Sequence, residues 1–181
     1  MKVYKIGFSK GFSVLSEETD LIKPQMFDGR SLQASWREPR VRVEQLSRGD
    51  VDTDYPFLAY GAIVVSTEAM DELVRCLSLD DVERLPLSCA PNQDGYTYEY
   101  ELLNVTRTVD CLDLKRSRVT TVAGKVIRVD KYFLDTTRLR GVSLFRLPQL
   151  PYVSLFTTEE GARCFKDLRR EGLEFREVFS D

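Results

Sequence analysis

The stretch GDVDTDYPFL carries three aspartates at alternate positions, a spacing that could serve to bind a hard cation. Asp50, Asp52 and Asp54 match the first three ligand positions of a calcium loop. Such a loop also needs glycine at its sixth position and glutamate at its twelfth, where this chain has Tyr55 and Gly61. The stretch is therefore interpreted as a solvated acidic turn before a buried strand, and no metal site is predicted.

Nucleophilic catalysis is restricted by the absence of histidine from the chain. Without histidine there is no Ser-His-Asp triad, no Cys-His pair and no histidine-ligated metal. The cysteines follow no CxxC spacing and are expected to be reduced core thiols: Cys76, Cys89, Cys111 and Cys164. Basic neighbours could lower the pKa of the Cys164 thiol, although a small buried hydrophobe is the favoured role.

Paired carboxylates are the other possible source of catalysis. Asp110 and Asp113 could act as acid and base. No GxGxxG or GxxxxGK[ST] loop is present, so no nucleotide cofactor is predicted. The lack of the commonest catalytic groups favours a non-catalytic binding protein. The alternative is an enzyme that uses these carboxylates or Cys164.

The composition is that of a folded chain. Of the 181 residues, 43% are hydrophobic, which is enough to fill a core. No apolar run approaches the roughly 18 residues of a membrane span, and the N-terminus lacks the apolar region of a secretory signal. A cytoplasmic location without membrane contact is expected.

Charge is distributed unevenly along the chain, although the net charge is only −3. Residues 61–113 carry eleven acidic and three basic side chains, whereas residues 114–181 carry nine acidic and fourteen basic ones. This polarity indicates either an acidic binding surface or two solvated faces that attract each other within one domain. The candidate partner-binding carboxylates are Glu68, Asp71, Glu72, Asp80, Asp81, Glu83, Asp94 and Glu99, with Glu101 beside them.

Direct nucleic-acid binding by the basic C-terminal helix is not predicted. The sequence pI is about 5.2, and no nucleic-acid-binding module is present.

The elements that must position these side chains follow from hydrophobic periodicity. Helices are predicted at residues 66–77, where Met70, Leu73, Val74 and Leu77 form a core-facing stripe, and from a Thr157-x-x-Glu160 capping box to Gly172. In the second helix Phe165 and Leu168 should face inward, with Lys166, Arg169 and Arg170 outward. Strands are predicted at residues 3–8, 41–46, 62–65, 85–89, 96–109, 119–122, 125–134, 144–147, 153–156 and 173–179.

This order of elements predicts an α+β fold with a largely antiparallel or mixed sheet, two main helices and an irregular N-terminal arm. Residues 1–181 are expected to form one domain, with the strand and arm in residues 1–40 and the core in residues 41–179. Within the predicted strand 96–109, Tyr96, Tyr98 and Tyr100 alternate with polar residues and share one face. Core packing is favoured for this face over a binding platform.

The order of motifs resembles a known family. The motifs are DYPFL after the acidic turn, LPLSC, Leu102 to Thr106 (LLNVT) followed by Asp110 and Asp113, and Leu144 to Pro148 (LFRLP). Together they resemble the myxobacterial-type immunity proteins of bacterial polymorphic toxin systems, the family numbered eleven. The resemblance covers about residues 41–179, and residues 9–36 match nothing in it.

The resemblance implies a non-catalytic protein that binds and neutralises the C-terminal domain of a cognate toxin. A nuclease toxin would suit the acidic third, because its substrate cleft is basic. The motif residues Asn104, Thr106, Asp110 and Asp113 are interpreted as structural, with the first two bonding a local turn and the others holding the next loop against Arg116 or Arg118. No cofactor and no oligomeric state are predicted.

Overall fold

The computed structural model describes residues 1–59, 61–78, 80–92, 95–152 and 154–181. It contains two α-helices and several small sheets that are antiparallel except for one parallel pairing, β3 with β6. The α+β fold predicted from the sequence is therefore confirmed. No helix among the described residues is long and apolar enough to cross a membrane.

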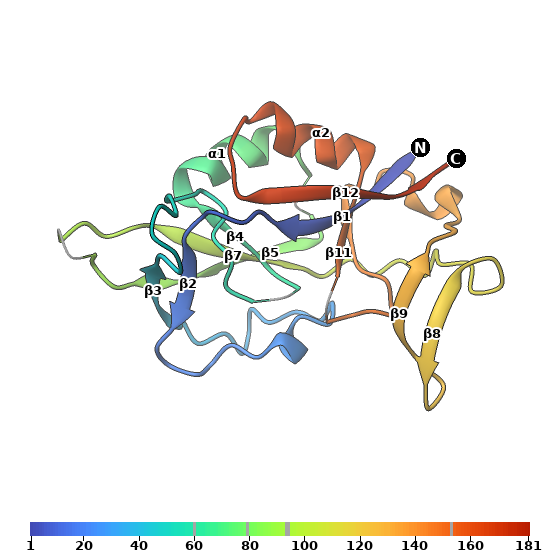
Figure 1. Cartoon of the computed structure of the whole chain (residues 1–181), viewed down its shortest axis with the longest axis horizontal. Helices are drawn as coiled ribbons and strands as arrows, with labels where there is room; N and C mark the ends of the chain where they lie inside the picture. Colours follow the sequence, from blue (N-terminus) through green and yellow to red (C-terminus); the bar gives the residue numbers. More distant parts are fainter. Residues whose placement is uncertain (60, 79, 93–94, 153) are drawn as a thin grey trace.

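The first strand of the chain lies inside a four-stranded antiparallel sheet rather than in an appended arm. β1 (Lys2–Phe8) pairs with β11 (Leu155–Thr158) on one side and with β12 (Leu173–Ser180) on the other, and β10 (Leu144–Phe145) pairs with β11. The two ends of the chain consequently lie together (Figure 1). The N-terminal ammonium bonds the Asp181 carboxylate there.

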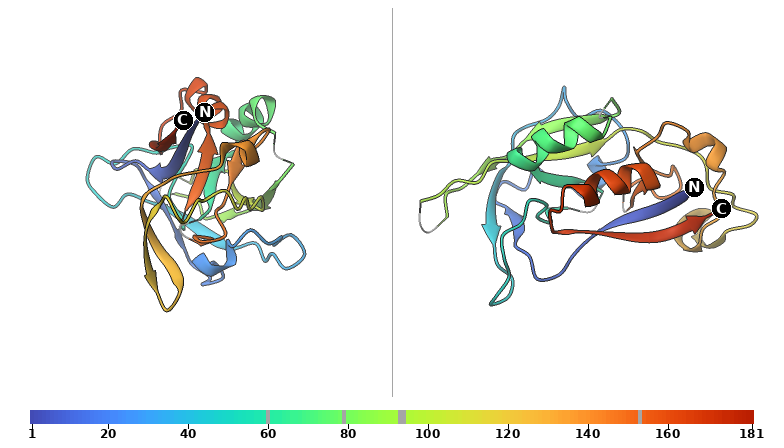
Figure 2. Two further views of the ribbon diagram at one scale, coloured as in Figure 1. Left: turned by 90° about the vertical axis from the view of Figure 1, so that its right-hand side faces the viewer. Right: turned by 90° about the horizontal axis from the view of Figure 1, so that it is seen from above.

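The two helices lie beside each other on one side of the molecule (Figure 2), and α2 (Glu159–Asp167) contacts β1 and β11 of this sheet. α1 (Thr67–Cys76) begins after Ser66, whose Oγ accepts a hydrogen bond of 3.2 Å from the amide of Ala69. Three residues of the predicted stripe are buried, but Val74 is 42% exposed, so the stripe is narrower than its spacing indicated.

α2 (Glu159–Asp167) does not begin with the predicted capping box. Its N-cap is Thr158, which makes no side-chain cap bond. The Thr157 hydroxyl instead donates to the carbonyl of Ser143 at 2.9 Å, because Thr157 still belongs to β11 and lies against the neighbouring segment.

A second sheet lies next to the first and is buried on both faces at its centre. β7 (Tyr100–Val105) runs between β4 (Ile63–Ser66) and β5 (Val82–Pro86), and Leu102 and Leu103 are both fully buried. Of the predicted strand 96–109, the central six residues form β7, and Thr108 makes a separate bridge with Arg146. The predicted strand 85–89 is divided between β5 and β6 (Ser88–Cys89).

The remaining elements form the periphery. β2 (Val14–Glu17), β3 (Arg40–Glu44) and β6 form a small sheet, so the segment expected to be irregular contains a strand and the short helix η1 (Pro24–Met26). β8 (Arg118–Val122) and β9 (Lys125–Lys131) form the predicted hairpin, which projects from one end (Figure 1), and η2 (Thr136–Leu139) follows. At the opposite end, described residues of the β6–β7 connection extend outward.

Candidate partner-binding site

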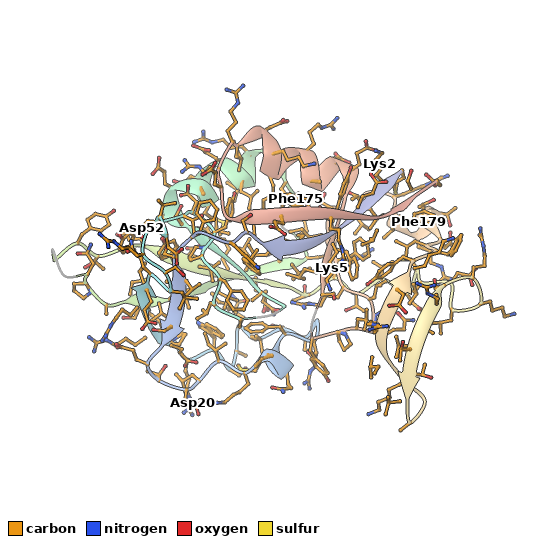
Figure 3. The ribbon with its side chains drawn as sticks, viewed as in Figure 1. Lys2, Lys5, Asp20, Asp52, Phe175 and Phe179 are labelled. Carbon is orange, nitrogen blue, oxygen red and sulfur yellow. The ribbon has the colours of Figure 1, made fainter. Side chains whose placement is uncertain are left out.

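Three segments that the sequence presented separately meet in one groove. The acidic turn contributes Asp52 to Asp54, the start of α1 contributes Ser66 to Glu68, and the segment before β7 contributes Tyr96 to Tyr100. The groove has a volume of about 500 Å³. Figure 3 places Asp52 at the end of the molecule from which the β6–β7 connection extends. We call this surface the acidic–tyrosine groove.

The tyrosines form a continuous series from the core to the solvent. The Tyr98 and Tyr100 rings are stacked with centroids 5.9 Å apart, and the Tyr96 ring meets Tyr98 edge-on at 4.9 Å. Exposure rises from 5% at Tyr100 to 61% at Tyr96. The inner ring therefore packs in the core, as favoured from the sequence, while the outer ring is exposed to solvent.

Hydrogen bonds attach the tyrosine series to the acidic turn. The Tyr100 hydroxyl donates to the carbonyl of Thr53 at 2.9 Å, and the Tyr98 hydroxyl donates to the Asp52 carboxylate. The bond to Asp52 raises the pKa of Tyr98 above its usual value. These contacts hold the groove's two walls in a fixed relation.

One cation that follows α2 partly neutralises the groove. Arg170 lies 2.9 Å from a carboxylate oxygen of Asp54, 2.8 Å from Glu72 and 3.3 Å from Glu68. The hydrogen bond from Arg170 lowers the pKa of Glu72. The prediction that Arg170 faces outward is wrong, because only 17% of its side chain is exposed. Its orientation depends on tertiary contacts that helical periodicity does not encode.

The other candidate carboxylates do not all belong to this groove. Glu99 lines it, and Asp71 lies exposed on α1. Asp80 and Asp81 follow the far end of α1, where Asp80 accepts a bond from Ser78 and Asp81 lies 3.6 Å from Arg107. Glu101 forms two bonds with Arg84, at 2.6 and 3.0 Å. Asp94 lies outside the described residues.

Glu83 has an internal role that its charge alone did not reveal. Its carboxylate accepts hydrogen bonds from the Ser31 hydroxyl and, at 2.8 Å, from the Leu32 amide. The Asn104 side chain donates to Glu83 and to the carbonyl of Arg30, both at 2.9 Å. Asn104 therefore fastens the N-terminal segment to the second sheet, rather than bonding a local turn.

The LFRLP motif contains an arginine that is fully buried. Arg146 donates from Nε to the carbonyl of Val105 at 2.6 Å, and from its two terminal nitrogens to the carbonyls of Gly61 at 2.5 Å and Pro151 at 3.1 Å. Burial lowers the pKa of this guanidinium to about 10, so it remains charged at neutral pH. The side chain joins three segments that are distant in the sequence.

Asn104 of the LLNVT motif and Arg146 of the LFRLP motif thus both hold separate segments of the fold together. A family model described as the immunity protein family (Imm11) matches residues 8–178. The chain belongs to the Imm11 immunity protein family. The match begins at residue 8, so it includes the segment 9–36 that the sequence resemblance left unmatched. A search of curated proteins found no match.

Membership of Imm11 favours a non-enzymatic role, and the site chemistry agrees at Cys164. The Cys164 thiol lies 2.7 Å from the carbonyl of Cys76, and burial and the neighbouring Cys76 thiol raise its pKa to about 12. A thiol in this state is a poor nucleophile at neutral pH. The hypothesis of a low-pKa thiolate is therefore wrong. Of the four cysteines, only Cys111 is a fully buried core thiol.

The remaining motif residues of the Imm11 chain make separate contacts. Thr106 donates to the carbonyl of Asp81 at 2.9 Å. Asp110 accepts a bond of 2.7 Å from the Gln149 side chain. Asp113 accepts hydrogen bonds from the backbone amides of Lys115 and Arg116 at 2.9 and 3.1 Å. It therefore holds the following loop through backbone amides rather than through an arginine side chain.

The aspartates of the acidic turn also have separate partners. Asp50 accepts a hydrogen bond from the amide of Ser47, and Asp52 accepts one from the hydroxyl of Tyr98. Asp54 accepts hydrogen bonds from the side chains of Ser66 and Arg170. Among the described residues, no group of three or more cysteine or acidic side chains is arranged to hold a metal ion.

Changing Glu83 to Gln should destabilise the protein at pH 7 and have progressively less effect in acid. Burial alone would raise the pKa of Glu83, but the bonds from Leu32, Ser31 and Asn104 outweigh it and lower the pKa below its usual 4.5. A lowered folded-state pKa adds stability above the usual pKa, and this stability is lost as the pH falls through the folded value.

The measurement is the melting temperature of both proteins between pH 7 and pH 3. The gap between wild type and Glu83→Gln should narrow below about pH 4.5. The exposed Glu159, changed to Gln, is the matched control and should produce no comparable gap at pH 7. A gap for Glu83→Gln that stays constant across this range would contradict the assigned hydrogen bonds.

Proposed function

We propose that this chain protects the cell that makes it by binding the C-terminal domain of a cognate toxin in the cytoplasm, without catalysis. Family membership supports the immunity role. The observation that carries the binding step is the acidic–tyrosine groove, which combines an exposed aromatic ring with carboxylates held at fixed positions. Tyrosine is a frequent anchor of protein interfaces because it buries a large area with few rotatable bonds.

The charge of the groove indicates the kind of toxin surface that fits it. The groove is lined by the carboxylates of Asp52, Asp54, Glu68 and Glu99. Arg170 pairs with two of them, Asp54 and Glu68, so a net negative charge remains. A positively charged surface would be attracted to this groove and would associate faster. The substrate cleft of a nuclease is such a surface, because it must bind phosphates. We propose a nuclease domain as the partner.

The test is coexpression of this chain with the C-terminal domain of the toxin encoded beside it. We expect the two chains to co-purify as a stable complex, and we expect the purified chain to inhibit the isolated toxin domain in a ratio of one to one. A toxin whose activity is unaffected by excess purified chain would refute the proposal. Inhibition that increases with incubation time and leaves the toxin altered after separation would instead indicate an enzyme.

A further inference from the structure

A second pocket lies away from the acidic–tyrosine groove and has the opposite charge. It lies between the first sheet and the β8–β9 hairpin, and its volume is about 480 Å³. β1, β9 and β12 contribute most of its lining, and Figure 3 shows Lys5 on the side of the sheet away from the two helices. Four cations and two carboxylates line it: Lys5, Arg128, Lys131, Arg176, Asp130 and Glu177.

Both carboxylates of this basic pocket already have cationic partners. Asp130 lies 2.8 Å from Arg128 and 3.8 Å from Arg118, and Glu177 lies 3.1 Å from Lys2. Lys131 stands over the ring of Phe133 at 4.8 Å. The acidic groups of the pocket therefore do not neutralise its two remaining cations.

Those two cations face each other across a pair of strands. Lys5 of β1 and Arg176 of β12 are register partners, and the side chain of neither forms an ion pair or hydrogen bond within the part of the chain that the structure describes. Like charges directly opposite in a sheet are destabilising. Burial and the charge of Arg176 lower the pKa of Lys5, which shows that the folded chain bears a cost for this arrangement.

A buried hydroxyl in the same pocket also lacks a partner. Ser154 is 2% exposed, and its oxygen has no hydrogen bond to any described residue. An unsatisfied buried polar group costs about 1–3 kcal/mol, so its presence calls for a ligand or an equivalent explanation. Ser154 lines the pocket together with Lys5 and Arg176.

We infer that this basic pocket binds a phosphate group between Lys5 and Arg176, with the Ser154 hydroxyl as a further donor. A phosphate accepts several hydrogen bonds and carries up to two negative charges, which match the two unpaired cations. The arginine fork suits two of its oxygens, and the lysine supplies a compact charge. Tyr132 and Leu150 also line the pocket, and its volume leaves space for the organic part of a phosphate ester.

The experiment titrates the full chain with inorganic phosphate and, separately, with adenosine 5′-monophosphate, using calorimetry and thermal melting. Sodium chloride keeps the ionic strength equal in every sample. We expect saturable binding of one phosphate group per chain and a matching rise in melting temperature. Tighter binding of the monophosphate would identify an ester as the ligand, and equal or weaker binding would identify the free ion.

Two variants test the assigned cations. Arg176→Met should weaken phosphate binding at least tenfold while leaving the unliganded protein as stable as wild type or more so, because the repulsion with Lys5 is removed. Lys5→Met should behave in the same way. Arg140→Met, at an exposed position outside the pocket, should bind phosphate like wild type. Absence of saturable binding, or equal binding by Arg176→Met and Arg140→Met, would overturn the inference.

Discussion

Replacing Arg146 with methionine should lower the free energy of unfolding by about 3 kcal/mol or more. The change leaves the carbonyls of Val105, Gly61 and Pro151 without their donors in the interior, and each such loss costs about 1–3 kcal/mol. Methionine has a flexible apolar side chain that can occupy much of the same space, so the expected loss comes from hydrogen bonding and not from a large cavity.

The prediction is tested by urea unfolding at neutral pH, with Arg140→Met as the matched control. Arg140 is exposed, so its replacement should change the free energy of unfolding by no more than about 0.5 kcal/mol. Arg146→Lys should remain strongly destabilised, because an ammonium group cannot reproduce the planar fork that reaches three carbonyls. If Arg146→Met unfolds at the same urea concentration as Arg140→Met, the guanidinium is not needed to hold these segments together.

The side of Gly61 that faces Arg146 shows how closely this region is packed. Gly61 has a φ of 84°, and a Cβ at this position would lie 2.6 Å from the carbonyl oxygen of Tyr152 and 3.3 Å from a terminal nitrogen of Arg146. Only glycine adopts this backbone conformation readily and leaves that space free. The carbonyl of Gly61 can therefore approach the Arg146 guanidinium, from which it accepts a hydrogen bond.

Local sequence signals were sufficient for the elements that depend on neighbours in the chain. Ser66 and the apolar spacing after it predicted α1, and the turn at Ala123 and Gly124 predicted the β8–β9 hairpin. Both residues of that turn have positive φ angles, 48° and 76°. The alternation of tyrosines predicted that their rings share a face, and the ring contacts agree although residues 96–99 are not paired as a strand.

The features that depend on distant pairing could not be predicted in the same way. Helical periodicity predicts that the side chain of Arg170 is exposed. However, α2 ends before Arg170, and this side chain bonds Asp54, which lies 116 residues earlier in the sequence. In the sequence Glu83 cannot be distinguished from an acid on the surface. Its carboxylate accepts hydrogen bonds from Ser31 and Leu32 only because that distant segment lies against β5. No periodicity within one segment encodes such contacts.

Neutralising the open carboxylates of the acidic–tyrosine groove should slow association with the toxin domain about tenfold or more at low salt. The variant combines Asp52→Asn, Glu68→Gln and Glu99→Gln. These changes preserve side-chain shape, and the amide oxygen introduced by Asp52→Asn can still accept the bond from Tyr98. Glu72 and Asp54 are left intact, because they make the shorter bonds to Arg170, at 2.8 and 2.9 Å, and their loss would change stability as well as binding. Glu68 lies 3.3 Å from Arg170 and is 81% exposed, so its replacement should cost little stability. This prediction rests on the proposed function.

The measurement is the association rate by surface plasmon resonance at several salt concentrations, and the gap between variant and wild type should narrow as salt screens the charges. The control triple variant Asp20→Asn, Glu159→Gln and Glu174→Gln removes equal charge from exposed positions outside the groove, so it should associate nearly as fast as wild type. Tyr96→Ala removes contact area without charge and should act mainly on the dissociation rate. If the two triple variants slow association equally, overall charge governs the encounter and the groove does not. If neither variant nor Tyr96→Ala alters binding while the complex still forms, the toxin contacts another face of the chain.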